Sequence, residues 1–361
     1  MCFSTSMRKV SSEVYRPILP GLPDDVAKYC LALVPRSDFP NLGAVCKRWR
    51  SFIESKECIT IRKEAGKLEE WLYVLTNDAE GKGSHWEVLR TSGGKNHLVP
   101  PMPGPMKAGF GVVVFEGKIL IFGGYLVDAE IGCVSADVHQ YDSRLNRIKH
   151  LLNMERASQV ECGPLRLRLR RAQRLIYVVG GYGTDGERLS SVEAYDPNRN
   201  EWTFIEPLRR PRWGCFASAI QGKLFVMGGR SSFSIGNSRS VDIYDPALRS
   251  WSEVKKGCVM VTAHAVLRDR LFCMEWKNQR RLVVFDPVEC EWKVVMVPLT
   301  GSSAIGFRFG VFGGKLLLFS LEEEPGYKTL VYDPDAGPGL EWRTSEIRPG
   351  GLCLYSVTIE V

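Results

Sequence analysis

The sequence has little that would suggest a membrane-bound or secreted protein. No apolar run approaches the ~18 residues that cross a bilayer, and residues 1–16 lack the apolar core found in secretory signals. We expect those residues to form a flexible tail. The 11 cysteines include no C-x-x-C pair, so neither a zinc site nor a disulfide framework is indicated. These absences favour reduced thiols and a cytoplasmic and/or nuclear location.

Motifs for catalysis are also missing. The chain has no G-x-S-x-G, H-E-x-x-H or P-loop sequence. Residues 181–186 match the dinucleotide pattern G-x-G-x-x-G, but the next residues enter a strand-like run instead of the helix that such a site requires. No metal-site spacing is found among the histidines, which are His85, His97, His139, His150 and His264. We expect a glycine-rich hairpin at 181–186, no cofactor, no metal and no enzyme.

The charge balance gives little reason to expect a nucleic-acid partner. With 48 Lys and Arg against 41 Asp and Glu, the net charge is +7 over 361 residues, which is modest for the length. A hydrophobic share of 44% and a charged share of 25% are ordinary for a globular protein. The composition therefore favours one or two domains with a substantial core.

What the chain does contain is a repeated unit of short β-like runs. One element is a Gly-Lys turn, four apolar residues and a glycine pair, as in residues 117–124 and 222–229. A second element is an aromatic residue followed by Asp, at Tyr141, Tyr195, Tyr244, Phe285 and Tyr332. These aromatics lie 54, 49, 41 and 47 residues apart, close to the ~50 residues of a kelch repeat. The copies resemble kelch repeats, and a tryptophan follows the aromatic by seven positions in three of them.

The repeat predicts a β-propeller. Each unit would be a four-stranded blade that buries its faces only against its neighbours. The glycine pair would end a strand near the crowded axis, and the aromatics would fill the space between blades. The 291 residues from Trp71 to Val361 hold about six repeats at this spacing. We therefore expect a mainly β fold, a six-bladed kelch propeller with five full repeats and one blade shared by the two ends.

Residues 17–60 do not fit the repeat and have helical periodicity. A helix is predicted to begin at Asp24 and Asp25, with acidic residues in its first turn, and to end before Pro35. A second apolar face runs from Leu42 to Ile53. So small a unit makes a marginal core, so its apolar surface would be covered either by a protein partner or by the propeller itself. Residues 61–70 are charged and would form a short connector.

This helical region resembles the F-box over its whole length. The resemblance rests on three motifs: Leu22-Pro23-x-Asp25, Leu31-x-x-Val34-Pro35 and Val45-Cys46-Lys47-x-Trp49-Arg50-x-x-Ile53. An F-box followed by kelch repeats is similar to the F-box/kelch-repeat proteins of plants. The resemblance implies that the helices bind a Skp-type adaptor and, through it, a cullin ubiquitin ligase. The residues implied at that interface are Leu22, Pro23, Val26, Leu33, Val34, Pro35, Val45, Cys46 and Trp49.

The target-binding surface of the propeller is predicted from basic and aromatic residues near the junctions between blades. Arg and Trp are favoured anchors at interfaces, and together they could hold an acidic protein segment. The candidates are Lys107, Arg156, Arg212, Trp213, Arg230 and Trp276. The alternative is that these arginines only pair with loops of neighbouring blades. The Leu/Arg-alternating residues 165–171 are either an edge strand with a basic face or an inserted basic loop.

These predictions combine into one function. The chain is expected to be the non-catalytic substrate-recognition subunit of a Skp–cullin–F-box ubiquitin ligase, whose propeller binds a target protein for ubiquitination and proteasomal degradation. The alternative is a kelch interaction scaffold that recruits no ligase. A copper oxidase built on a propeller is a third possibility, but it would need histidines converging on the axis.

Overall fold

The computed structural model describes residues 17–77, 83–89, 97–104, 107–126, 133–154, 165–166, 175–184, 186–231, 239–255, 257–258, 261–277, 279–298, 306–322 and 328–360. The chain divides into two compact units, a helical one up to Glu69 and a β-rich one over Glu70–Glu360. Within the described residues, no helix is both long and apolar enough to span a bilayer.

The helical unit consists of short helices that pack on one another. They are α1 (Asp24–Leu33), the 3-10 helix η1 (Arg36–Asp38), α2 (Phe39–Val45), α3 (Lys47–Glu54) and α4 (Lys56–Glu64). Its core contains Ala27, Leu31, Phe39, Phe52 and Ile53, all less than one-tenth exposed. Phe52 and Ile53 come from the second predicted apolar face, whereas Phe39 lies before it and was not predicted.

Two details of the helices differ from the sequence expectation. Helix α1 is capped by Pro23, and Asp24 and Asp25 lie inside its first turn, where acidic side chains interact favourably with the helix dipole. The apolar face from Leu42 to Ile53 is two helices, because Cys46 has an extended backbone with φ −158° and ψ 165°. The break turns α3 away from α2.

The β-rich unit is a propeller of six four-stranded sheets, which confirms the predicted architecture. The first sheet has the order β26-β1-β2-β3 and the second β5-β6-β8-β9. Their bounds are β1 (Glu70–Asn77), β2 (Ser84–Leu89), β3 (His97–Leu98), β5 (Gly111–Phe115), β6 (Lys118–Phe122), β8 (Val138–Asp142), β9 (Arg147–His150) and β26 (Leu352–Glu360). A two-stranded sheet joins β4 (Lys107–Ala108) to β7 (Tyr125–Leu126).

The remaining four blades follow the order of the chain. The third and fourth contain β10 (Leu165–Arg166), β11 (Ile176–Val179), β12 (Val192–Asp196), β13 (Glu201–Phe204), β14 (Trp213–Ile220), β15 (Lys223–Arg230), β16 (Val241–Asp245) and β17 (Ser250–Val254). The fifth and sixth contain β18 (Val261–Leu267), β19 (Arg270–Lys277), β20 (Gln279–Asp286), β21 (Glu291–Val295), β22 (Phe307–Phe312), β23 (Lys315–Ser320), β24 (Thr329–Tyr332) and β25 (Trp342–Ser345).

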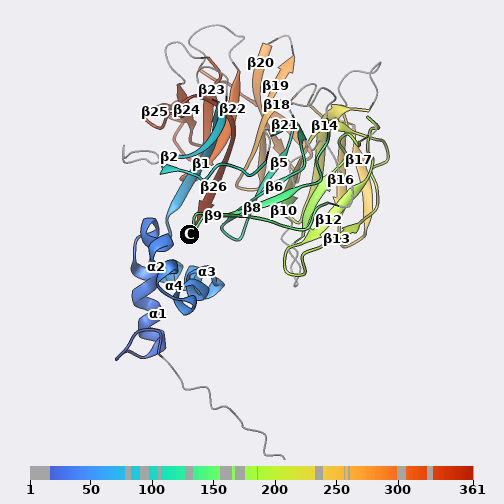
Figure 1. The fold of residues 1–361 in the computed structure, drawn as a ribbon. Coiled ribbons are helices and arrows are strands. Elements are labelled where there is room, and N and C mark those ends of the chain that lie inside the picture. Colours follow the sequence, from blue (N-terminus) through green and yellow to red (C-terminus); the bar gives the residue numbers. More distant parts are fainter. Residues whose placement is uncertain are drawn as a thin grey trace, which may run out of the picture. The chain divides into compact units, whose positions relative to one another are not determined.

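The first blade is assembled from segments far apart in the sequence. Strand β26 pairs antiparallel with β1 from Glu70↔Glu360 to Asn77↔Leu352, with one bulge, and Figure 1 shows the two strands lying side by side. A ring of sheets closed in this way leaves no edge between its first and last repeats. The last strand of this blade is the short β3, and residues 100–103 after it are irregular, because proline cannot donate to a strand ladder.

The repeated aromatics form cross-strand pairs between the third and fourth strands of a blade. The ring pairs are Tyr195–Trp202 at 4.8 Å, Tyr244–Trp251 at 5.1 Å, Phe285–Trp292 at 4.9 Å and Tyr332–Trp342 at 4.9 Å between centroids. The indole nitrogen of Trp202 also donates to the carbonyl of Leu152 at 3.1 Å. Because residue 152 follows the last strand of the preceding blade, the tryptophan ties two blades together.

The Gly-Lys and aromatic-Asp elements are coupled by an ion pair. Lys223 lies 3.0 Å from Asp245, and Lys315 lies 2.7 Å from Asp333. The same Asp245 carboxylate accepts the backbone N–H of Ala247 at 2.9 Å, which closes the turn after the strand. Its pKa is lowered, first by the hydrogen bond from Lys223. The ion pair therefore links the start of the second strand of a blade to the end of the third.

The glycine pairs lie where another backbone segment approaches closely, from the next blade at Gly180 and from the adjacent strand of the same blade at Gly229. Gly180 has φ +63°, and a Cβ there would lie 2.3 Å from the carbonyl oxygen of Arg212. Gly229 has φ +71°, and a Cβ there would lie 2.5 Å from the carbonyl oxygen of Trp213. Both the left-handed backbone and the lack of space require glycine.

Candidate functional site

The helical unit exposes most of the apolar residues implied at the adaptor interface. Val45 is 60% exposed, and Val26, Leu22 and Leu33 are between 38% and 42% exposed. Pro23, Pro35 and Cys46 are also exposed, whereas Val34 and Trp49 are half-buried. Tyr29, which the motif comparison missed, is 48% exposed on the same helix as Val26. So much apolar surface on a unit of this size is typical of a protein-binding face.

Two interactions hold the ends of this face in position. The indole nitrogen of Trp49 donates to the carbonyl of Ile18 at 2.9 Å, so the segment before Leu22 is tied to α3. Asp24 accepts the backbone N–H of Ile18 at 2.8 Å. The Leu22-Pro23 turn is therefore fixed between α1 and α3 and does not depend on the partner for its shape.

A buried arginine supports the other end of the face. Arg62 of α4 is 1% exposed and donates from one nitrogen to the carbonyls of Ala32 at 2.6 Å and Val34 at 2.8 Å. Its other terminal nitrogen lies 3.0 Å from Glu69, and its guanidinium lies over the Phe39 ring at 5.1 Å. Since α1 ends at Leu33, Arg62 satisfies carbonyls that the helix leaves unpaired.

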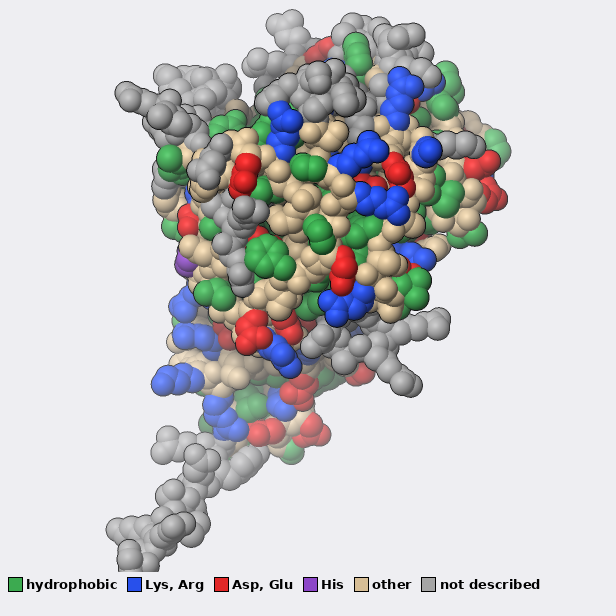
Figure 2. Space-filling view, turned by 90° about the vertical axis from the view of Figure 1, so that its right-hand side faces the viewer, with side chains coloured by type: hydrophobic (Ala, Val, Ile, Leu, Met, Phe, Trp, Pro, Cys, Tyr) green, Lys and Arg blue, Asp and Glu red, His purple; other side chains and the backbone are tan. Residues whose placement is uncertain are grey.

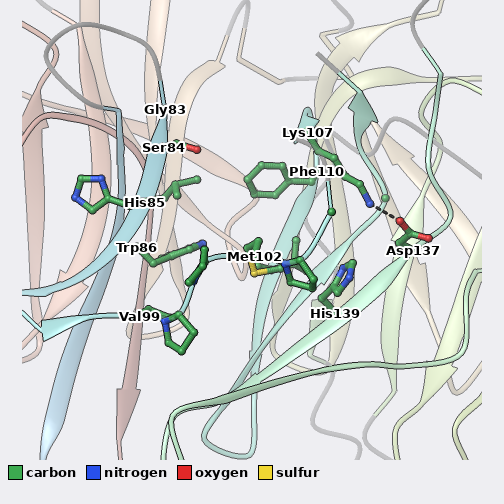
Figure 3. Close-up of a pocket in the computed structure, with 17 residues that line it drawn as sticks. Gly83, Ser84, His85, Trp86, Val99, Met102, Lys107, Phe110, Asp137 and His139 are labelled. Atoms are coloured by element: carbon green, nitrogen blue, oxygen red, sulfur yellow. Dashed lines mark hydrogen bonds and ion pairs between the residues drawn. The ribbon is translucent and has the colours of Figure 1, made fainter. Parts of the chain in front are cut away.

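A pocket lies between the first and second blades of the propeller. Its volume is about 420 Å³, and it is lined by Trp86, Val99, Met102 and Phe110, together with Pro100, Pro101 and Pro103. Figure 3 shows Trp86, Met102 and Phe110 around one space, with Lys107 and Asp137 at its edge. The Phe110 ring stacks on Tyr355 of β26 at 5.4 Å between centroids. A largely apolar, preformed cavity of this size suits a bulky side chain or a small ligand.

The polar residues of this pocket are already paired or neutral. Lys107, a predicted target-binding residue, lies 2.5 Å from Asp137 and 2.9 Å from the Ser135 hydroxyl. The pKa of Asp137 is lowered, chiefly by the hydrogen bond from Lys107. The pKa of His139 is lowered by burial and by the charge of Lys107. At neutral pH the pocket therefore presents a neutral imidazole and a compensated ion pair beside its apolar wall.

Arg212, another predicted target-binding residue, has a structural role instead. It is 4% exposed, and one of its terminal nitrogens lies 2.7 Å from the carboxylate of Asp242, which is 5% exposed. It also donates to the backbone carbonyl of Ser240 at 3.3 Å and to its hydroxyl at 2.9 Å. The prediction is wrong for this residue, because its charged end is buried. The alternative does not describe it either, since its side-chain partners belong to the fourth blade and not to the loop of a neighbouring blade. Arg156 lies outside the described residues.

The other three candidates form two aromatic–arginine clusters. The guanidinium of Arg230 lies 5.8 Å from the ring of Trp213, and that ring lies 5.0 Å from Tyr182. Trp276 is half-buried and has the guanidinium of Arg280 at 5.2 Å. Arg280 was not among the predicted residues. It lies opposite Trp276 in the strand register, so hairpin pairing could have indicated it.

Basic and acidic side chains are interspersed among the described residues of the propeller face in Figure 2. In the fourth blade, Arg209 lies 3.7 Å from Glu253 and Lys223 lies 3.0 Å from Asp245. Such a surface lacks the continuous basic stripe of a nucleic-acid-binding face.

The structure confirms the hairpin at the glycine-rich motif. Gly183 donates its backbone N–H to the carbonyl of Glu187 at 2.8 Å, and Tyr182 bridges Arg188. Strand β12 follows, and none of the described residues after the loop begins a helix before that strand. The motif is therefore part of the scaffold.

Two of the histidines are neighbours in the propeller. His139 and His150 are partners across β8 and β9, with ring centroids 5.2 Å apart, although their spacing in the sequence gave no such indication. His150 lies 3.8 Å from Asp137. Among the described residues, no three His, Cys, Asp or Glu side chains are grouped as metal ligands.

The Leu/Arg-alternating segment 165–171 lies only partly within the described residues. Leu165 and Arg166 form β10, which pairs with Ile176 and Tyr177 at the first position of the third blade. The first two residues of the Leu/Arg run thus belong to a strand at the edge of its sheet. Residues 167–171 lie outside the described residues.

Comparison with known proteins matches both units. The F-box domain model matches residues 19–60, and the KLHDC2/KLHL20/DRC7 Kelch-repeats domain model matches residues 109–319. F-box/kelch-repeat protein At1g67480 of Arabidopsis thaliana is 53% identical over 99% of this chain and 95% of its own length. Putative F-box/kelch-repeat protein At1g27420 of the same plant is 38% identical over 95% of this chain and 97% of its own. The helical face and the propeller described above are therefore those of a protein that belongs to the F-box/kelch-repeat family.

Proposed function

We propose that the chain is the substrate-recognition subunit of a Skp–cullin–F-box ubiquitin ligase. An F-box joined to a kelch propeller implies this receptor role. In the proposed complex the helical unit binds the Skp-type adaptor, and through it the cullin, while the propeller binds a target protein for ubiquitination and proteasomal degradation. The chain itself contributes proximity, by holding the target near a ubiquitin that another subunit supplies. We place this activity in the cytoplasm, the nucleus or both.

The exposed apolar face of the helical unit is the observation that carries the proposal. Leu22, Val26, Leu33 and Val45 keep between 38% and 60% of their surface exposed to water, although the burial of such side chains is the main favourable term in protein association. Their supports, Trp49 and Arg62, are tied by hydrogen bonds to backbone carbonyls. A face that is both apolar and preformed is suited to binding without a large ordering cost.

Replacing Val45 with Asp is expected to weaken adaptor binding by about 100-fold or more. The change places a charge in an apolar interface without a partner. Because Val45 is 60% exposed in the free chain, the fold should tolerate it. The affinity of the purified full-length chain for a Skp-type adaptor is measured by isothermal titration calorimetry.

Leu340→Asp provides the matched control, since Leu340 is 75% exposed and belongs to the propeller. Adaptor affinity should equal that of the unmodified chain. Unchanged binding of Val45→Asp, or no adaptor binding by the unmodified chain, would contradict the ligase role and favour a scaffold.

The pocket between the first two blades is proposed to anchor the target. Phe110→Asp is expected to abolish target capture because it charges the apolar wall opposite Trp86. The measurement is proximity labelling in cells with the proteasome inhibited, comparing proteins enriched by the unmodified chain, by Phe110→Asp and by Leu340→Asp. If Phe110→Asp enriches the same proteins as the control, the pocket is not the target site.

A further inference from the structure

Two arginines of adjacent blades lie close together without an acidic partner. Arg280 is the second residue of β20 in the fifth blade, and Arg308 lies on β22 in the sixth. Within the described residues, neither side chain forms an ion pair. By contrast Arg281, the next residue along β20, lies 2.6 Å from Glu275, and Arg212 lies 2.7 Å from Asp242.

The guanidinium of Arg280 is held in place but is not satisfied. Its Nε and Nη1 atoms are buried and have no hydrogen-bond partner among the described residues. The group lies 5.2 Å from the Trp276 ring and packs against the sixth blade, where a Cβ on Gly306 would lie 2.4 Å from Nη1. The residue as a whole remains partly exposed, so a ligand can approach it from solvent.

Arg308 adds a second positive charge to the same place. Its Nη1 donates to the backbone carbonyl of Thr262 at 2.6 Å, which leaves the charge uncompensated. The pKa of Arg280 is lowered by burial and by the charge of Arg308, whereas the negative charge of Glu322 raises it.

Two titratable groups beside Arg308, His264 and Cys353, are uncharged at neutral pH. Burial and the charge of Arg308 lower the pKa of His264 to about 4, so the imidazole is neutral at pH 7. Burial raises the pKa of Cys353 to about 12, so that side chain is a thiol. The site therefore keeps an excess of positive charge at physiological pH.

Such an arrangement is unfavourable in the free protein and favourable once an anion binds. A buried donor without a partner costs free energy, and like charges repel. The planar guanidinium donates two parallel hydrogen bonds to a carboxylate. An anion placed against the solvent-exposed part of the two side chains would offset the repulsion between their charges.

We propose that Arg280 and Arg308, with Trp276 as a supporting wall, form a subsite for a carboxylate of an acidic segment in the target protein. The proposal rests on the role of the propeller as a target receptor and names the chemistry of the target. Each blade begins its first strand at the same face of a propeller, so this subsite and the apolar pocket lie at the same face. An extended segment with an acidic residue and a bulky apolar residue can therefore use both.

The subsite is tested with a short fluorescein-labelled peptide of glutamate and glycine. Its binding to the full-length chain is measured by fluorescence anisotropy. We expect Arg280→Gln and Arg308→Gln each to weaken binding by about tenfold or more, and added salt to weaken binding to the unmodified chain. Arg147→Gln removes the same charge from an exposed position on β9 and should bind like the unmodified chain.

Three further measurements separate the possible outcomes. A phosphoserine version of the peptide tests the anion: arginine-dependent binding of that peptide alone would replace the carboxylate assignment by phosphate. The melting temperature of Arg280→Gln should be unchanged or higher, because the variant removes an uncompensated charge; a clear fall would indicate a structural role and overturn the proposal. Both variants should bind the adaptor as the unmodified chain does. Adaptor binding therefore tests the ligase role, and peptide binding tests the subsite.

Equal peptide binding by Arg280→Gln, Arg308→Gln and the unmodified chain would also overturn the proposal.

Discussion

Replacing Asp242 with Ala is expected to lower the free energy of unfolding of the propeller by about 3–5 kcal/mol. The change leaves the guanidinium of Arg212 buried without its carboxylate at 2.7 Å. Burial already lowers the pKa of Arg212 and raises the pKa of Asp242, so each charge depends on the other. Urea unfolding followed by fluorescence measures the effect.

The double variant Arg212→Met/Asp242→Leu is the control for this prediction. Removing both charges should restore most of the lost stability, because a buried ion pair contributes little over an apolar pair of similar volume. If Asp242→Ala lowers the free energy of unfolding by less than about 1 kcal/mol, the prediction is contradicted. The guanidinium of Arg212 would then be hydrated in the folded protein, as in a surface ion pair.

Replacing Arg62 with Met is expected to unfold the helical unit at temperatures where the propeller is intact. Three hydrogen bonds from a charged donor are lost, each worth about 1.5–3 kcal/mol, in a unit that has little core to spare. Hydrogen–deuterium exchange should increase over Asp24–Glu64 and remain unchanged in the blades. Adaptor affinity should fall together with this protection, because Val34 and Pro35 lose their support.

Lys63→Met is the matched control, since Lys63 is the exposed neighbour of Arg62 on α4. It should change neither the exchange pattern nor adaptor binding. Normal protection of the helical unit in Arg62→Met would show that the carbonyls of Ala32 and Val34 find other partners.

The blade architecture could be predicted from the sequence because its determinants are local. The Tyr244–Trp251 pair and the Lys223–Asp245 pair each join residues of one hairpin or of neighbouring strands, so their spacing repeats along the chain. The helical unit could be predicted for a similar reason, since its Leu-Pro and Val-Pro turns stand beside clear helical periodicity. In both cases the residues that define the structure are close in sequence.

The parts that were missed depend on tertiary contacts. Arg212 stands in the basic run 209–213 and looks like a surface residue, but its partner Asp242 is far along the chain. The apolar pocket brings Trp86, Met102 and Phe110 together only after the first blade packs on the second. Arg280 is of interest because its buried nitrogens have no hydrogen-bond partner among the described residues. No sequence pattern indicates that a side chain lacks a partner.

The pairing of β26 with β1 has a consequence for how the protein is made. In every other blade the strands are synthesised one after another. In the first blade, β1 pairs with β2 early, but its other neighbour, β26, is synthesised only after β25. The helical unit has no such delay, because it is a compact unit of consecutive residues up to Glu69 and can fold during translation. An interrupted synthesis would therefore yield a polypeptide that occupies an adaptor and has an open ring, so that it competes with intact receptors without delivering a cargo.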